Sequence, residues 1–193
     1  MSDEDIIKDF RAMRYGRMQR IWRPFMEKYH CDVIAEIGVR KGYNFWKMIK
    51  HGPKLAVAVD SWTEDGVRSR NDVASSQESL DGQYQRVVER YGQLPFVKIY
   101  REYSFEAVKR FPDNYFDLVY IDGDHSYEGC LRDIKDWYPK VKSGKFLVGD
   151  DYRVLTNRQG VKFGVIEAVN EFTKKKKLKF FEFPYAKWGI IKP

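Results

Sequence analysis

The chain has 193 residues, of which 43% are hydrophobic and 33% charged, a balance typical of a globular domain with its own core and not of a disordered chain. Its apolar runs stay well short of the ~18 residues that a membrane-crossing helix needs, and the acidic start MSDEDIIKDF is unlike a secretion signal. We therefore expect a cytoplasmic protein with no membrane partner. The formal net charge of +7 leaves a polyanionic partner such as nucleic acid open, although a solvated basic surface explains it without any ligand.

The predicted elements begin with a helical extension over residues 1–30, in which apolar residues recur at helix spacing. Its apolar face would suit a homo-oligomer interface. Residues 31–193 then form one domain. In chain order, the pattern predicts strand 32–38, helix 42–52, strand 55–60, loop 61–79, helix 80–92, strand 96–100, helix 104–111, strand 116–122, helix 126–137, strand 144–151, helix 161–175 and two strands within 178–192 that turn at Pro184. The long polar loop 61–79 is a candidate lid over a site.

This alternation of strands and helices predicts the fold class. The strands are nearly continuous Val, Ile, Leu and Ala, as expected for strands covered on both faces. We therefore expect an α/β protein: a single-domain, Rossmann-like, doubly wound sheet of about seven strands, with the last strand antiparallel and a helical extension at the N-terminus.

A glycine-containing turn follows the first predicted strand. The stretch AEIGVRKG places Glu36, Gly38 and Gly42 at the start of a helix, and Asp60 ends the next strand. Glycines let a backbone approach a ligand closely, and a carboxylate in this position can accept hydrogen bonds from both hydroxyls of a ribose. The alternatives are a plain tight turn for the glycines and a loop cap for Asp60. Together, at the ends of successive strands, these residues favour a nucleoside-ligand site.

A cluster of acids follows the fourth and fifth predicted strands. The run FDLVYIDGDHSYEGC carries Asp122, Asp124 and His125, and GKFLVGDD ends in Asp150 and Asp151. Neighbouring parallel strands end at the same edge of a sheet, and crowded carboxylates raise one another's pKa values or bind a cation. The alternative is that these acids cap helices and turns. His125 is a candidate base because an imidazole can take a proton from a hydroxyl near neutral pH.

The order of the motifs VIAEIGVRKG, LAVAVDSW, YREYSFEAV, FDLVYIDGDHSY and GKFLVGDDY resembles that of class I S-adenosylmethionine-dependent methyltransferases, from about residue 30 to the end. The resemblance implies a methionine- and ribose-binding turn after the first strand, an acid on the ribose hydroxyls after the second, and adenosine contacts beside it. The cofactor-binding residues it implies are Glu36, Gly38, Gly42, Asp60, Ser61, Trp62, Ser104 and Asp122.

The acid motifs are similar to those of a metal-dependent subset, the sugar and small-molecule O-methyltransferases of the macrocin O-methyltransferase type and of methyltransferase family 24. This resemblance implies Mg²⁺ bound by Asp122, Asp150 and Asp151, a catalytic base at Asp124 or His125, and a hydroxylated acceptor such as a sugar or another natural product. Two alternatives remain. One is a nucleic-acid (RNA) methyltransferase using the basic surface, against which the Asp-Gly-Asp-His sequence argues. The other is a non-catalytic S-adenosylmethionine-binding module.

Overall fold

The structure, a computed structural model, describes residues 22–65, 76–156, 160, 162–183 and 185–193. Within them the helices are α2 (Trp22–Tyr29), α3 (Tyr43–Ile49), α5 (Gln77–Tyr91), α6 (Ser104–Ala107), α7 (Tyr127–Trp137) and α8 (Val165–Lys176), with 3₁₀ turns at Val108–Arg110 and Tyr138–Lys140. The strands are β1 (Val33–Ile37), β2 (Leu55–Asp60), β3 (Val97–Arg101), β4 (Phe116–Ile121), β5 (Val141–Gly149), β6 (Phe180–Phe183) and β7 (Lys187–Ile191). Most of the predicted N-terminal extension, most of the candidate lid and the turn residue Pro184 lie outside the described residues.

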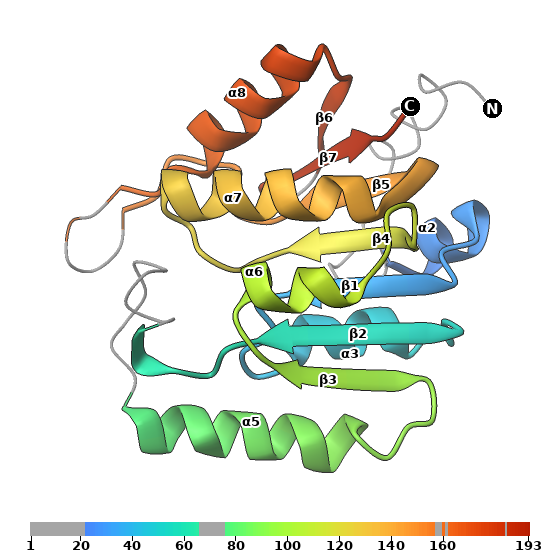
Figure 1. Cartoon of the computed structure of the whole chain (residues 1–193), viewed down its shortest axis with the longest axis vertical. Helices are drawn as coiled ribbons and strands as arrows, with labels where there is room; N and C mark the ends of the chain where they lie inside the picture. Colours follow the sequence, from blue (N-terminus) through green and yellow to red (C-terminus); the bar gives the residue numbers. More distant parts are fainter. Residues whose placement is uncertain (1–21, 66–75, 157–159, 161, 184) are drawn as a thin grey trace.

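These strands form one sheet in the order β3-β2-β1-β4-β5-β7-β6 (Figure 1). β1 to β5 pair in parallel, and β7 runs antiparallel to both of its neighbours. The predicted fold class is therefore confirmed, including the antiparallel last strand. Ile37 of β1 pairs with Ile121 of β4, which pairs with Gly149 of β5, so these three strands end level with one another. The strand order reverses between β1 and β4, where ligands bind in such sheets.

Helices cover both faces of the sheet, and each covered face has its own apolar core. Figure 1 shows α6 and α7 in front of the sheet and α2 and α3 behind it. Ile34 packs in the core with α2, α3 and α5, whereas its neighbour Ala35 packs in the core with α6, α7 and α8. Because successive strand residues point to opposite faces, both must be apolar. This explains the continuous apolar runs in the sequence.

The aromatic residues of α2 pack inside this chain. The ring of Trp22 lies 5.3 Å from that of Tyr120, and the rings of Phe25 and Tyr29 lie 4.9 and 5.1 Å from that of Phe146. All five side chains are buried. The end of the predicted extension is therefore a layer of the fold, and this part of its apolar face is not available to a second copy of the chain.

Several element boundaries differ from the prediction. β5 ends at Gly149, so the two following acids lie in a loop rather than on the strand. α8 begins at Val165, four residues later than predicted. α5 begins at Gln77, three residues earlier, because the Ser76 hydroxyl accepts a hydrogen bond from the Ser79 N–H and caps the helix.

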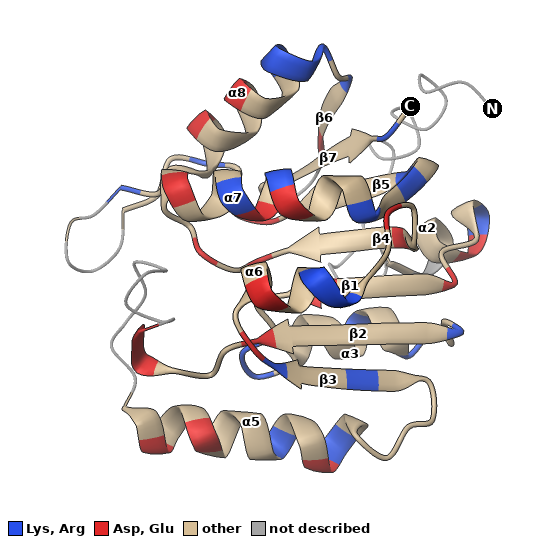
Figure 2. Cartoon of the chain, viewed as in Figure 1, with Lys and Arg blue, Asp and Glu red and all other residues tan. Residues whose placement is uncertain are grey.

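Basic residues are distributed over several elements. Figure 2 shows Lys and Arg on α5, α7 and α8, each of which also carries Asp or Glu. Three lysines, Lys174, Lys175 and Lys176, form the last turn of α8, where positive charge interacts favourably with the helix dipole. In the described part of the chain, no helix combines the length and apolar character needed to cross a membrane.

Candidate active site

The turn between β1 and α3 passes directly against the end of β4. Gly38 has a φ of 92°, and a Cβ placed on it would lie 2.0 Å from the backbone oxygen of Asp122. Gly42 has a φ of 74°, and a Cβ there would lie 2.8 Å from the ring of Tyr91. Other residues rarely adopt such backbone angles. The backbone angles and the close contacts thus require glycine at both positions. Gly38 borders two cavities at this edge of the sheet.

Asp60 connects the loops that follow β1 and β2. Its side chain is buried and accepts hydrogen bonds from the backbone N–H of Arg40 at 2.8 Å and of Trp62 at 2.9 Å. These bonds hold the carboxylate at the end of β2, where it lines a cavity. The predicted ribose contact is compatible with this geometry.

A first cavity, here named the β2–β3 cavity, opens beside Asp60. It is lined by Ile37, Gly38, Val59, Asp60, Ser61, Glu102, Tyr103, Ser104, Gly123, Asp124, Arg132 and Asp133. Of the predicted adenosine contacts, Ser61 and Ser104 lie on its wall. Trp62 does not line it: the indole is buried, and its N–H donates to the carbonyl oxygen of Arg40 at 2.8 Å. Trp62 therefore holds the turn after β1 in place.

Residues that were not predicted complete this cavity. Glu102 follows β3 at the same edge as Asp60, so the strand-end argument could have found it. Arg132 and Asp133 come from α7, and no local sequence signal marks them. The Ser104 hydroxyl donates a hydrogen bond to the buried carboxylate of Asp133, which fixes both side chains on the cavity wall.

A second cavity, the β1–β4 cavity, has a volume of about 410 Å³, within the range of small-molecule sites. It is lined by Glu36, Gly38, Val39, Arg40, Lys41, Tyr43, Asn44, Lys47, Asp122, His125 and Asp150. Glu36 is 1% exposed; its Oε1 accepts a hydrogen bond from the Asn44 amide at 2.8 Å. Its Oε2 has no hydrogen-bond partner among the described residues. Burial raises the pKa of Glu36 well above its ordinary value, although the Asn44 hydrogen bond opposes this shift.

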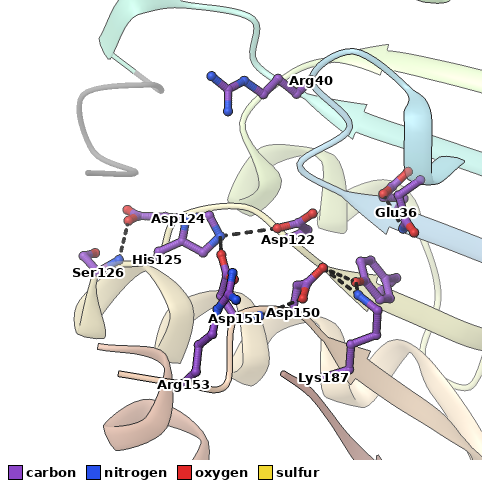
Figure 3. Close-up of polar contacts among 12 residues, drawn as sticks. Glu36, Arg40, Asp122, Asp124, His125, Ser126, Asp150, Asp151, Arg153 and Lys187 are labelled. Carbon is purple, nitrogen blue, oxygen red and sulfur yellow. Dashed lines mark hydrogen bonds and ion pairs between the residues drawn. The ribbon is translucent and has the colours of Figure 1, made fainter. Parts of the chain in front are cut away.

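Three predicted residues meet at the end of β4. The Nε2 atom of His125 lies 3.3 Å from Asp122 Oδ1 and 3.4 Å from Asp151 Oδ2, as Figure 3 shows. One ligand atom from each of the three lies within 4.8 Å of the others. The His125 ring stacks on Phe163 with 4.7 Å between ring centroids, which fixes its plane. Burial raises the pKa of Asp122, and the hydrogen bond with His125 opposes the shift.

Asp124, the other candidate base, is turned away from this group. Its Oδ1 accepts a hydrogen bond from the backbone N–H of Ser126 at 2.9 Å, and Figure 3 shows it pointing toward Ser126. A Cβ placed on Gly129 would lie 2.1 Å from the Asp124 Cγ, so the carboxylate lies directly over the first turn of α7. The cap of α7 itself is Ser126, whose hydroxyl accepts a hydrogen bond from the Gly129 N–H at 3.0 Å, so Asp124 holds the cap residue in place and does not cap the helix as the sequence alternative had it.

Asp150 is also separate from the group, although it lies at the same edge. Its Oδ2 accepts hydrogen bonds from the Lys187 ammonium at 2.6 Å and from the Tyr120 hydroxyl at 2.7 Å. Burial would raise the pKa of Asp150, but the Lys187 charge and the hydrogen bonds from Lys187, Tyr120 and the Asp151 N–H together outweigh it, and the pKa lies below its ordinary value. The structure thus brings together Asp122, His125 and Asp151, whereas the predicted cation set was Asp122, Asp150 and Asp151.

A model of the family described as "Methyltransferase domain" (methyltransferase family 24) matches residues 35–152, which include the turn after β1 and all of the acids above. The chain belongs to this methyltransferase family. The uncharacterized protein R132 of Acanthamoeba polyphaga mimivirus is 24% identical to the methyltransferase over 166 residues, covering 79% of this chain and 72% of that protein.

Solved methyltransferases share the fold. The Podospora anserina methyltransferase PaMTH1, solved with S-adenosylhomocysteine, superposes with a TM-score of 0.63 at 14% identity, over 94% of this chain and 81% of that one. An O-methyltransferase from Bacillus cereus, also solved with S-adenosylhomocysteine, gives 0.61 at 12% identity, over 98% and 88%. Identities this low show the fold, and the family match shows the activity class: this is an S-adenosylmethionine-dependent methyltransferase.

The residues of the methyltransferase fit the methyl donor. Gly38 lines both cavities, so an extended ligand can pass over it from one to the other. The β2–β3 cavity offers the acceptors that a nucleoside needs, and the β1–β4 cavity offers the buried Glu36 Oε2 without a partner. A buried carboxylate oxygen is costly unless it is paired, and the ammonium of the donor's methionine part would pair with it.

Proposed function

We propose that this methyltransferase transfers a methyl group from S-adenosylmethionine to a hydroxyl of a small, hydroxylated acceptor, a sugar or another natural product. The observation that carries the proposal is the position of His125. Its Nε2 lies between the carboxylates of Asp122 and Asp151. His125 lines the β1–β4 cavity, as do Glu36 and Gly38. A candidate base thus borders the space that the donor's methionine part would fill.

In the proposed complex the donor lies across Gly38. Its ribose hydroxyls bond to Asp60 and its adenine lies at the mouth of the β2–β3 cavity near Ser61 and Ser104; the cavity has a volume of only about 30 Å³, so its walls would separate to admit the ring. Its ammonium pairs with Glu36, so the sulfonium methyl lies near the end of β4. This placement is supported by the cavity that Gly38 shares and by the sheet's switch point, where ligands of this fold bind.

His125 would take the proton from the acceptor hydroxyl. A neutral imidazole is a suitable base near pH 7, and the carboxylates of Asp122 and Asp151 would stabilise the imidazolium that forms. The stacked ring of Phe163 keeps the imidazole from rotating away. The hydroxyl oxygen then attacks the methyl carbon in line with the departing sulfur, and holding both reactants at attack distance lowers the barrier.

The donor set also fits a divalent cation. Mg²⁺ prefers carboxylate oxygens and is commonly held by one or two of them together with water and substrate, so Asp122 and Asp151 would hold it. Such a cation would acidify an acceptor hydroxyl. The two carboxylates would orient the acceptor against His125.

The first experiment measures binding and turnover. We expect calorimetry to detect S-adenosylhomocysteine binding, and radiolabelled S-adenosylmethionine to give methylated products from a panel of sugars and phenols with adjacent hydroxyls. If the donor binds but only RNA is methylated, and no small hydroxylated acceptor is, the proposed acceptor class is refuted.

The second experiment compares the two candidate bases. His125→Asn should lower kcat by about 10²–10⁴-fold, the usual contribution of a general base, with little change in donor affinity. Asp124→Asn is the matched control because an Asn oxygen can still accept the Ser126 N–H, and its kcat should fall far less. A larger loss in Asp124→Asn than in His125→Asn would show that the base is misassigned.

A further inference from the structure

Glu36 is an acid on the face of the sheet that α2 and α3 cover (Figure 1). It pairs with Ala58 of β2 and with Tyr120 of β4, and both of these neighbours lie in the apolar core that includes residues of α2 and α3. A carboxylate buried among apolar groups is costly unless it accepts hydrogen bonds. One of the two covering helices therefore has to supply a donor to Glu36.

Asn44 of α3 supplies that donor, and its amide is held in turn by α2. Asn44 Nδ2 donates to Glu36 Oε1 at 2.8 Å, and Asn44 Oδ1 accepts a hydrogen bond from the Trp22 indole N–H at 3.2 Å. Trp22 is 2% exposed, so this N–H is shielded from water. The three side chains thus form one series of hydrogen bonds that runs from α2 through α3 to β1.

The indole determines which way the Asn44 amide faces. An indole N–H can donate and cannot accept, whereas an amide has an acceptor oxygen on one side and two N–H donors on the other. If the amide were reversed, its NH₂ group would meet the Trp22 N–H and its oxygen would meet the Glu36 carboxylate. Two hydrogen bonds would then become two repulsive contacts between buried groups. Trp22 therefore holds the Asn44 NH₂ group against Glu36 Oε1.

This arrangement leaves the second oxygen of Glu36 for a ligand. Oε2 is buried and has no hydrogen-bond partner among the described residues, and both Glu36 and Asn44 line the β1–β4 cavity. The Asn44 hydrogen bond also lowers the pKa of Glu36 against the larger effect of burial. It therefore favours the ionised carboxylate, which is the form that an ammonium pairs with.

We infer that Trp22 is a positioning residue for the methyl donor: through Asn44 it orients Glu36 toward the ammonium of the donor's methionine part. The inference rests on the donor placement proposed above. The family model matches residues 35–152, so the donor site of this methyltransferase extends to a helix that the family match does not include.

The N–H of Trp22 has to be tested separately from its ring, because the ring also packs 5.3 Å from that of Tyr120. Two ligands make this possible. S-adenosylhomocysteine carries the ammonium, whereas methylthioadenosine keeps the nucleoside and the sulfur but lacks the amino-acid part. Both are titrated by calorimetry into the full chain.

Trp22→Phe removes the N–H donor and keeps an aromatic ring. It should weaken S-adenosylhomocysteine binding by about 3–10-fold, the value of one hydrogen bond. Methylthioadenosine binding should change by less than about two-fold, the usual scatter for independent sites, because this ligand has no ammonium for Glu36 to meet. A role in packing alone would weaken both ligands alike.

Phe25→Leu is the matched control from the same helix. Phe25 is fully buried, with its ring 4.9 Å from that of Phe146, and a phenylalanine side chain has no N–H or O–H donor to lose. This variant should lower Tm through lost packing and leave the ratio of the two affinities within about two-fold of wild type. If Trp22→Phe does not fold, benzothienylalanine in place of Trp22 keeps the bicyclic ring and replaces only the N–H by sulfur. It should give the same selective loss.

A double-mutant cycle with Glu36→Gln measures the coupling directly. Because Trp22 acts through the Glu36 carboxylate, Trp22→Phe should weaken S-adenosylhomocysteine binding by less than about two-fold when it is introduced into Glu36→Gln. This cycle decides the question by itself where methylthioadenosine binds too weakly to measure.

The inference is overturned if Trp22→Phe, or the benzothienylalanine variant in its place, weakens both ligands equally or leaves S-adenosylhomocysteine binding unchanged. It is also overturned if the effect persists in Glu36→Gln, or if Phe25→Leu changes the affinity ratio as much. In these cases the proposed donor placement stands as long as Glu36→Gln binds S-adenosylhomocysteine more weakly than wild type. Failure of wild type to bind S-adenosylhomocysteine, or equal binding by Glu36→Gln, would count against the proposed function and remove the inference with it.

Discussion

Gly38→Ala tests whether the close approach of the β1 turn to β4 shapes the site. The added methyl would lie 2.0 Å from the Asp122 carbonyl oxygen, 2.4 Å from the Asp122 carbonyl carbon and 2.7 Å from the Gly123 Cα. All three are backbone atoms, so no side-chain rotation relieves the overlap. The ends of β1 and β4 would have to separate, and Asp122 would move with them.

The loss in the free energy of unfolding caused by Gly38→Ala has two contributions. A left-handed backbone at Ala costs about 1–2 kcal/mol, and forcing an extra methyl into a packed region costs about 1–3 kcal/mol. The sum, about 2–5 kcal/mol, corresponds to a loss of about 4–20 °C in Tm for a chain of this size. Because Gly38 lines both cavities, affinity for S-adenosylhomocysteine should also fall, by about ten-fold for each 1.4 kcal/mol of binding free energy lost.

Gly52→Ala is the matched control. Gly52 has a similar φ of 71°, but a Cβ there would meet nothing within 4 Å, so only the backbone contribution of about 1–2 kcal/mol remains. Thermal unfolding followed by circular dichroism, together with calorimetry of donor binding, measures both effects. The reasoning fails if Gly38→Ala is no less stable than Gly52→Ala, or if the two variants bind S-adenosylhomocysteine equally well.

Three further predictions concern charge. Glu36→Gln should weaken S-adenosylhomocysteine binding by about 10–100-fold, the value of a hydrogen bond to a charged group. Because burial raises the pKa of Glu36, its contribution to stability is present at acid pH and lost as pH rises; the Tm of Glu36→Gln relative to wild type should therefore increase between about pH 5 and about pH 8. The pKa of Asp150 is lowered in the folded protein. Its contribution to stability is therefore present above the unfolded-state pKa of about 3.9 and is lost as pH falls through the folded-state pKa. Below about pH 4, wild type should lose Tm more steeply than Asp150→Asn. EDTA should lower methyl transfer and added Mg²⁺ should restore it, and undiminished turnover in EDTA would refute the cation requirement.

The sheet and the donor side of the site could be predicted because their signals are local. Each strand is an apolar run, because a strand buried on both faces needs apolar side chains on both. Glu36, Gly38 and Asp60 lie at strand ends, and strand ends in a parallel sheet meet at one edge. Position in the sequence was therefore enough to place these three residues together.

The roles within the acid motif could not be predicted from the same signals. Asp122 and Asp124 differ by two positions, and both fit a base, a ligand or a cap. The structure separates them through the start of α7: the N–H of Ser126 is available just ahead of the first helical turn, and Asp124 is the acid within reach of it. The helix cap is Ser126, and the local sequence does not show which of the two nearby acids bonds to the backbone N–H of that cap residue.

The partner of Asp150 depends on strand direction rather than on sequence spacing. In a parallel sheet every strand contributes its last residues to the ligand edge, so residues that follow apolar runs are the ones to inspect. β7 is antiparallel, and it therefore contributes its first residue, Lys187, to that edge. Nothing near Lys187 in the sequence distinguishes it from the many other lysines of a basic chain. Its effect appears only when β7 pairs with β5, because that pairing places a buried positive charge against one of two adjacent acids and not the other. An acid pair that looks symmetric in the sequence thus becomes asymmetric in the fold, and that asymmetry assigns Asp151, and not Asp150, to the side of His125.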